Sequence, residues 1–150
     1  MMRFMLAACA IALCACTPAQ EAREESPVTN ASVPAPTPQD VTTRITAAQN
    51  GQTVQVAVGQ RFAVELVGMP TAGYVWAAST TPAFVQPAGE ASGNTSAAQS
   101  QPGYAGGNHW EVLMFTATTA GTGELVLEQR RPWETSEPAN ATFRVTIVAR

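Results

Sequence analysis

Few side chains in this sequence could carry out covalent chemistry. It contains a single aspartate, Asp40, and a single histidine, His109, which excludes a Ser-His-Asp triad or a cluster of Asp and His metal ligands from the folded part of the chain. His109 stands beside Trp110 and Glu111 without a recognisable nucleophile, as expected for an ordinary histidine at a strand end. An enzyme is therefore the least favoured class, and we expect no cofactor and no metal.

Charge and cysteine content narrow the possible partners and sites further. Eight arginines, no lysine and eleven acidic residues give a formal net charge of −3, whereas nucleic-acid binding requires a basic patch that neutralises phosphates. The three cysteines, Cys9, Cys14 and Cys16, all lie in the first sixteen residues, so the rest of the chain can form neither a disulfide nor a thiolate metal site. Burial of apolar side chains alone must stabilise the fold.

Three segments combine glycine or proline with aromatic side chains. The first is 69–76, Met-Pro-Thr-Ala-Gly-Tyr-Val-Trp, in which Pro70 fixes one backbone dihedral and Gly73 permits a positive φ. The second is 102–107, Pro-Gly-Tyr-Ala-Gly-Gly, and the third is 130–134, Arg-Arg-Pro-Trp-Glu. Taken singly, each is more simply explained as a turn, a hinge or an aromatic cap on the core. Together they favour a binding surface.

Short β-strands must position these segments, because apolar side chains beyond Asp40 alternate with a period of two. The alternation is clearest at 61–66, 124–128 and 142–147, and aromatic and β-branched residues predict further strands at 41–45, 53–58, 74–78, 84–86 and 110–118. We find no amphipathic helix and no internal repeat. Seven or eight strands in about 110 residues predict an all-β, immunoglobulin-like antiparallel β-sandwich.

The strand count also predicts where the three segments lie. Two expected strands separate the first segment from the second, and two separate the second from the third. In an antiparallel sandwich an even number of strands returns the chain to the same end. All three segments should therefore share one end of the molecule.

The combined pattern resembles the chagasin-like family of inhibitors of papain-type cysteine peptidases. The shared residues are Pro70-Thr71-x-Gly73-Tyr74-x-Trp76, then Gly106-Gly107, then Arg131-Pro132-Trp133-Glu134, and the resemblance covers 45–148. It implies an immunoglobulin-like inhibitor, reversible and competitive, whose first segment enters the active-site cleft while the other two clasp the enzyme on either side. The peptidase-binding residues that it implies are Pro70, Thr71, Ala72, Gly73, Tyr74, Tyr104, Ala105, Gly106, Gly107, Arg131, Pro132 and Trp133.

Three positions depart from the usual family pattern. The first segment of the family commonly reads Asn-Pro-Thr-Thr-Gly, but Met69 and Ala72 stand here in place of the amide and the second hydroxyl. The second segment commonly begins Gly-x-Gly-Gly, and Tyr104 takes the place of the first glycine. The resemblance implies that Thr71 lies nearest the enzyme thiolate, with 105–107 along one wall of the cleft and Trp133 on the other.

A second class of function fits the same aromatic residues. Trp133, Tyr104 and Tyr74 could form a platform for a carbohydrate or a protein partner, in an envelope-anchored immunoglobulin-like binding module. Loss of glycan binding after Tyr104→Ala or Trp133→Ala would distinguish this function from peptidase inhibition.

The beginning of the sequence is typical of an export signal. Arg3 precedes an apolar run over 4–13 that is too short to span a membrane. The sequence Leu-Cys-Ala-Cys at 13–16 resembles a bacterial lipobox, which predicts a signal peptide over 1–15 and acylation of Cys16. Signal cleavage without acylation is the alternative.

The expected anchor sets the location and the order of segments. Thr17, in place of the aspartate that retains lipoproteins in the inner membrane, favours anchoring to the outer membrane of the bacterial cell envelope. Residues 16–39 are rich in Pro, Ala, Ser, Thr and Glu and are expected to form a disordered tether. The inhibitor domain is expected to span 40–150.

Overall fold

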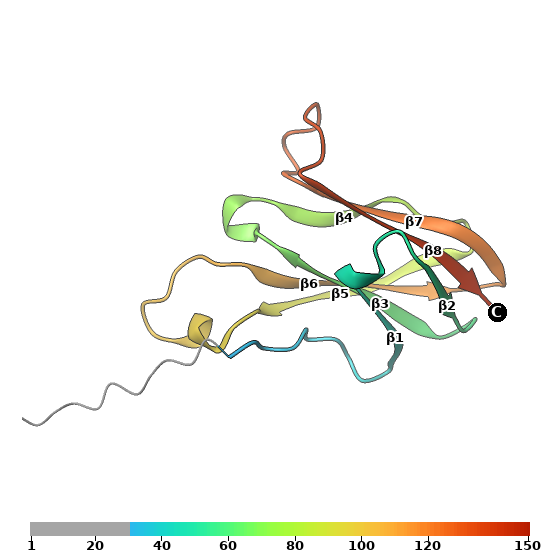
Figure 1. Ribbon diagram of the computed structural model, residues 1–150, viewed down its shortest axis with the longest axis horizontal. Coiled ribbons are helices and arrows are strands. Elements are labelled where there is room, and N and C mark those ends of the chain that lie inside the picture. Colours follow the sequence, from blue (N-terminus) through green and yellow to red (C-terminus); the bar gives the residue numbers. More distant parts are fainter. Residues whose placement is uncertain (1–30) are drawn as a thin grey trace, which may run out of the picture.

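The computed structural model describes residues 31–150, which form eight strands in two facing sheets (Figure 1). The predicted signal peptide and Cys16 lie outside the described residues. The strands are β1 (Val41–Thr46), β2 (Thr53–Val56), β3 (Arg61–Gly68), β4 (Val75–Thr80), β5 (Val85–Asn94), β6 (His109–Ala117), β7 (Gly121–Arg130) and β8 (Ala141–Ala149). Three short 3-10 helices join them, namely η1 (Ala47–Gln49), η2 (Pro70–Ala72) and η3 (Ala97–Ser100). No helix in this part of the chain is long and apolar enough to cross a membrane.

The strand order is β1-β3-β6-β5 in the first sheet and β2-β8-β7-β4 in the second. The all-β, immunoglobulin-like sandwich is therefore confirmed, but its sheets are not purely antiparallel. The edge strand β1 runs parallel to β3, and the edge strand β2 runs parallel to β8. Alternation of apolar residues reports which face of a strand is buried, and it carries no information on the direction of the neighbouring strand.

The main core lies between the two sheets, where the inward side chains of both meet. Phe62 of β3 and Phe115 of β6 stack there with ring centroids 5.6 Å apart. The other large, fully buried side chains of this core are Ile45, Val64, Leu125, Leu127, Val145 and Ile147. Burial of these side chains fixes the strands whose ends carry the three predicted segments.

A second, smaller cluster lies on the outer face of the first sheet. It contains Val41, Ala63, Val112 and Met114, and Ala35 packs against it. Residues 33–37 belong to the predicted tether, yet the structure has them along this sheet. Trp110 Nε1 donates to the carbonyl oxygen of Val33 at 2.7 Å, and Thr37 is buried. The domain thus begins before the predicted boundary at 40, because backbone hydrogen bonds and proline contacts leave no mark in the hydropathy.

Strand β5 is longer than the predicted extended run at 84–86, since it continues to Asn94. Pro87 and Gly89 are residues that usually interrupt a strand, but β5 is the edge strand of its sheet, where proline need not donate a hydrogen bond. The pairing of β5 with β6 shifts register between these two residues. A bulge therefore absorbs both of them without ending the strand.

Candidate functional site

The three segments predicted to share one end of the sandwich form the loops between consecutive strands. The first loop, 69–74, joins β3 to β4; the second loop, 95–108, joins β5 to β6; and the third loop, 131–140, joins β7 to β8. In Figure 1 all three lie on the side of the molecule away from the C-terminus, with the first loop between the third loop above and the second loop below. Thr71 Oγ1 lies 3.5 Å from the carbonyl oxygen of Gly107, and Arg131 Nε donates to the carbonyl oxygen of Ala72 at 3.0 Å. We call this set of loops the rim.

Backbone hydrogen bonds close the first loop on itself. Met69 and Tyr74 each donate their N–H to the carbonyl oxygen of the other, both at 3.1 Å, and Ala72 N donates to Met69 O at 2.9 Å. Pro70 occupies the first position of η2, where no N–H is needed, and Gly73 ends the turn at φ +84°. The tip is thereby held without the side-chain amide and hydroxyl usual in the family, and Pro70, Thr71 and Ala72 are all exposed.

Arg131 ties the third loop to the first. Besides its bond to the Ala72 carbonyl, its Nη1 donates to Glu134 Oε1 at 2.9 Å, and this bond raises the pKa of the guanidinium above its ordinary value. The guanidinium carbon also lies 4.6 Å from the ring centroid of Tyr74, at cation–π distance. Tyr74 is therefore half-buried beneath Arg131, and only part of its ring is open to a partner.

Three of the five exposed large apolar side chains in residues 31–150 lie in the rim. Trp133 is 68% exposed and Tyr104 is 47% exposed, while Met69 and Val67 lie in or directly beside the first loop and are also exposed. The Trp133 ring lies against Gly73, where a Cβ atom would stand 2.4 Å from Cη2. Clustering of exposed apolar side chains at one place is typical of an interaction surface.

A glutamine braces the second loop. Gln99 Oε1 accepts from the backbone N–H groups of Thr95 at 2.7 Å and Ser96 at 2.9 Å, and its Nε2 donates to the carbonyl oxygen of Asn108 at 2.7 Å. It thus joins the two ends of the loop. Gln99 is not among the predicted site residues, although the spacing Ser-x-x-Gln at 96–99 is a capping-box signal.

The exposed half of the second loop contains the predicted binding residues 104–107. Gly106 and Gly107 both have positive φ, +81° and +96°. A Cβ atom at Gly107 would lie 3.1 Å from Tyr104 Oη. Tyr104 therefore folds back over Gly107, and the missing side chain of Gly107 leaves room for the tyrosine ring.

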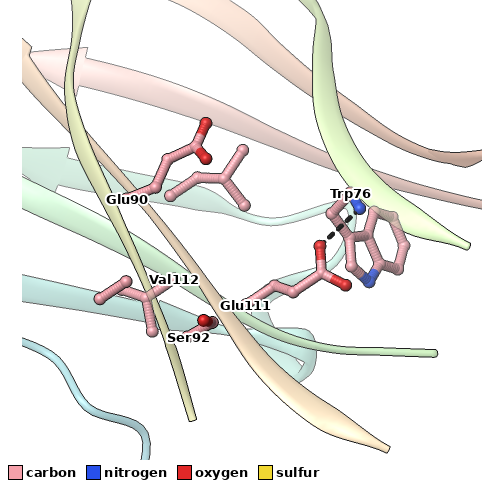
Figure 2. Close-up of a pocket in the computed structure, with 7 residues that line it drawn as sticks. Trp76, Glu90, Ser92, Glu111 and Val112 are labelled. Carbon is pink, nitrogen blue, oxygen red and sulfur yellow. Dashed lines mark hydrogen bonds between the residues drawn. The ribbon is translucent and has the colours of Figure 1, made fainter. Parts of the chain in front are cut away.

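Glu111 of β6 lies beneath the rim and reaches across to the second sheet. Figure 2 shows its carboxylate beside Trp76, whose backbone N–H donates to Oε2 at 2.7 Å. The other oxygen, Oε1, is buried without a hydrogen-bond partner and stands over Gly68, where a Cβ atom would be 1.6 Å away. Glu111 therefore joins β6 to the start of β4, close to both ends of the first loop.

The surroundings of Glu111 alter its acidity. Burial is the main cause that raises the pKa of this carboxyl above 4.5, and the nearby charge of Glu90 raises it further. The Trp76 hydrogen bond, which is the second largest effect, and the charge of His109 lower the pKa but do not offset the effect of burial. In the sequence Glu111 stands out only as a neighbour of His109, because its contact with Trp76 depends on a strand in the other sheet.

A hollow lies beside Glu111 and has two glutamates in its lining. It has a volume of about 350 Å³ and is lined by Trp76, Glu90, Ser92 and Glu111 with three apolar neighbours, so neither histidine nor cysteine lines it (Figure 2). Within residues 31–150, no group of three or more His, Cys, Asp or Glu side chains is placed to hold a metal ion. The rim, rather than this hollow, combines exposure with apolar character.

Comparison with known proteins identifies similar sequences and folds. A family model described as chagasin family peptidase inhibitor I42 matches residues 55–147, which include all three loops. Amoebiasin-1 of Entamoeba histolytica is 33% identical over 92 residues, which cover 59% of this chain and 82% of that protein.

Solved structures with the same fold include two with almost complete coverage of the matched chain. The crystal structure of the cysteine protease inhibitor EhICP2 from Entamoeba histolytica has a TM-score of 0.61 at 17% identity, over 72% of this chain and 95% of that chain. The solution structure of Amebosin has a TM-score of 0.58 at 28% identity, over 72% and 97% respectively.

Proposed function

The chain belongs to the chagasin family of peptidase inhibitors, and on this premise we propose that it is a reversible, competitive inhibitor of papain-type cysteine peptidases. Proteins of this family are inhibitors and not enzymes. The observation that carries the proposal is the rim, in which Arg131 joins the first and third loops and leaves Trp133 exposed beside them.

The first loop is the part that enters the cleft. A papain-type enzyme attacks a substrate carbonyl with a cysteine thiolate paired with histidine, and attack requires a precise approach to that carbonyl. An inhibitor needs only to fill the cleft without offering a carbonyl in that geometry. Pro70, Thr71 and Ala72 form the exposed tip, with Thr71 nearest the thiolate. Because backbone bonds already close this loop, little conformational entropy is lost when it binds.

The other two loops hold the enzyme on either side of the cleft. Residues 104–107 contact one wall, where the glycines let the main chain approach closely. Arg131, Pro132 and Trp133 contact the opposite wall, and the Trp133 ring is the central anchor, of a kind whose truncation commonly costs about 2 kcal/mol or more. Protease–inhibitor complexes typically bury ~800 Å² per partner, and we expect the three loops together to supply a contact of this size.

A carbohydrate platform is the competing function, and the rim favours it less. Such a platform requires open aromatic faces, but the guanidinium of Arg131 covers the ring of Tyr74. Only Tyr104 and Trp133 of the three predicted platform residues are exposed by more than a third.

We place the inhibitor in the bacterial cell envelope, as a lipoprotein of the outer membrane anchored through Cys16. This part of the proposal is supported by the lipobox-like residues 13–16 and by Thr17. Mass spectrometry of the mature N-terminus tests it, since acylated Cys16 must be the first residue.

A steady-state assay tests the inhibition. The chain from Thr17 onward is titrated against papain with a fluorogenic peptide, and against trypsin as a serine peptidase control. We expect the apparent KM for the peptide to rise with an unchanged kcat for papain, no effect on trypsin, and weaker inhibition by Trp133→Ala. Full papain activity at micromolar concentrations of the chain would refute the proposal.

A further inference from the structure

Residues 31–37 form a segment that the family match does not include, because that match begins at 55. In Figure 1 this blue segment runs beside the start of the loop between β5 and β6. We call residues 31–37 the N-terminal strap. Its contacts are to the second loop and to the sheet that carries this loop.

The first half of the strap pairs with the beginning of the second loop. Val33 N donates to the carbonyl oxygen of Thr95 at 2.9 Å, and Ala97 N donates to the carbonyl oxygen of Ala31 at 3.0 Å. Ser32 and Ser96 form an antiparallel bridge between these two bonds. The strap therefore acts as a short additional strand on the stretch of the loop that leads into η3.

From Val33 onward the strap is also fastened to the first sheet. The Trp110 indole donates to the carbonyl oxygen of Val33 at 2.7 Å. Pro36 packs on Gly93, where a Cβ atom would lie 3.2 Å from its Cγ. Thr37 is buried and donates its hydroxyl proton to Glu65 of β3. These contacts hold the strap in register with the loop.

The second loop is the connection most in need of such support. At 95–108 it is the longest connection between consecutive strands of the sandwich, and ordering a loop costs roughly 1–2 kcal/mol for each residue whose backbone becomes fixed. Within the loop, Gln99 joins the two ends, and among residues 31–150 only the strap adds backbone hydrogen bonds from outside the loop. Order in the free protein reduces the entropy lost when residues 104–107 bind a partner.

We propose that the N-terminal strap orders the second loop and thereby sets how tightly the rim binds a peptidase. The second part of this inference rests on the proposed function. In this chain the inhibitory surface thus depends on a proline-rich segment that precedes the domain matched by the family.

The sharpest test removes one strap donor. Val33→Pro deletes the N–H that bonds to Thr95, whereas Val33→Ala keeps it, and Val28→Pro is the same substitution outside the strap. All variants are made in the chain from Thr17 onward. A further variant replaces residues 31–37 with a Gly/Ser sequence of equal length, and the matched control replaces 22–28 in the same way.

Two measurements are made on each variant. Hydrogen exchange of amides in 95–101 should become faster in Val33→Pro and in the 31–37 replacement, while exchange in the first loop stays unchanged. The Ki for papain should rise about threefold in Val33→Pro, which loses one ordering contact. It should rise about tenfold in the 31–37 replacement, which loses several. Val33→Ala should retain most of the protection, and the controls at 28 and 22–28 should match the unmodified chain.

The outcomes separate the inference from the proposed function. Unchanged exchange in 95–101 after replacement of the strap would overturn the inference, whatever the inhibition. Faster exchange with an unchanged Ki, below the melting temperature of every variant, would overturn the link to affinity. Failure of the unmodified chain to inhibit papain would refute the proposed function, and the exchange data would still decide whether the strap orders the loop.

Discussion

Substitutions at Gly73 and Trp133 should have coupled effects on peptidase binding, because the Trp133 ring fills the space next to Gly73. A Cβ atom at Gly73 would lie 2.4 Å from Cη2 and 2.9 Å from Cζ2 of Trp133. Carbon atoms in contact prefer about 3.5–4.0 Å, so the ring must move by on the order of 1 Å in Gly73→Ala. The remaining neighbour, Cγ of Arg131 at 3.5 Å, is at ordinary contact distance.

Two separate costs follow from Gly73→Ala. Alanine at φ +84° is strained by roughly 1–2 kcal/mol, which lowers the stability of the free and the bound inhibitor alike. Displacement of Trp133 affects binding only. Loss of a central anchor commonly costs about 2 kcal/mol or more, which is a factor of about thirty in Ki. Because Gly73→Ala displaces the ring and does not remove it, we expect the Ki for papain to rise between about fivefold and thirtyfold.

A double-mutant cycle distinguishes these costs. With Trp133→Ala already present, the new methyl group has free space, and Gly73→Ala should change the Ki by less than about threefold. The Ki is measured with a fluorogenic peptide, and the free energy of unfolding is measured by urea denaturation of the same four proteins. An equal increase in Ki in both backgrounds would refute the assigned role of the Trp133 ring.

Two further substitutions test the supports of the rim. Arg131→Lys keeps the charge but cannot donate to the Ala72 carbonyl and to Glu134 in the same geometry, so we expect the Ki for papain to rise about tenfold with little change in unfolding free energy. Glu111→Gln keeps an oxygen that accepts from Trp76 N and removes the buried charge. Because burial raises the pKa of Glu111, the folded state binds its proton more tightly than the unfolded state, and stability falls as pH rises from 4.5 through the folded-state pKa. Urea denaturation across this window should show that fall in the unmodified protein and a flatter profile in Glu111→Gln; parallel profiles would contradict the assignment.

Much of the fold is predictable from the sequence because half-buried strands alternate apolar and polar residues. The alternation at 61–66, 124–128 and 142–147 lies within β3, β7 and β8. The even number of strands between loops then predicts a common end. The length of β5 is not predictable in this way, since Pro87 and Gly89 indicate a break unless the strand is known to be an edge with a bulge. The parallel edge strands are not predictable either, because the alternation does not report the direction of the neighbouring strand.

Some parts of the candidate site are likewise predictable from the sequence and others are not. Turn-forming and aromatic residues such as Pro70, Gly73 and Trp133 are visible in the sequence because their conformational effects are local. The supports are not visible, because they depend on pairing between distant segments. Glu111 meets Trp76 only across the two sheets, and the strap meets Thr95 only after the chain has folded. Composition alone assigned the strap to a disordered tether.

The most direct test of the account is whether the rim occupies the active-site cleft. Binding of the chain from Thr17 onward is measured by calorimetry to papain with a free cleft and to papain whose cleft is filled by a covalently attached peptidyl inhibitor. We predict tight, one-to-one binding to the free enzyme and no binding to the filled enzyme. Equal binding to both would contradict the account, because the rim would then contact a surface outside the cleft.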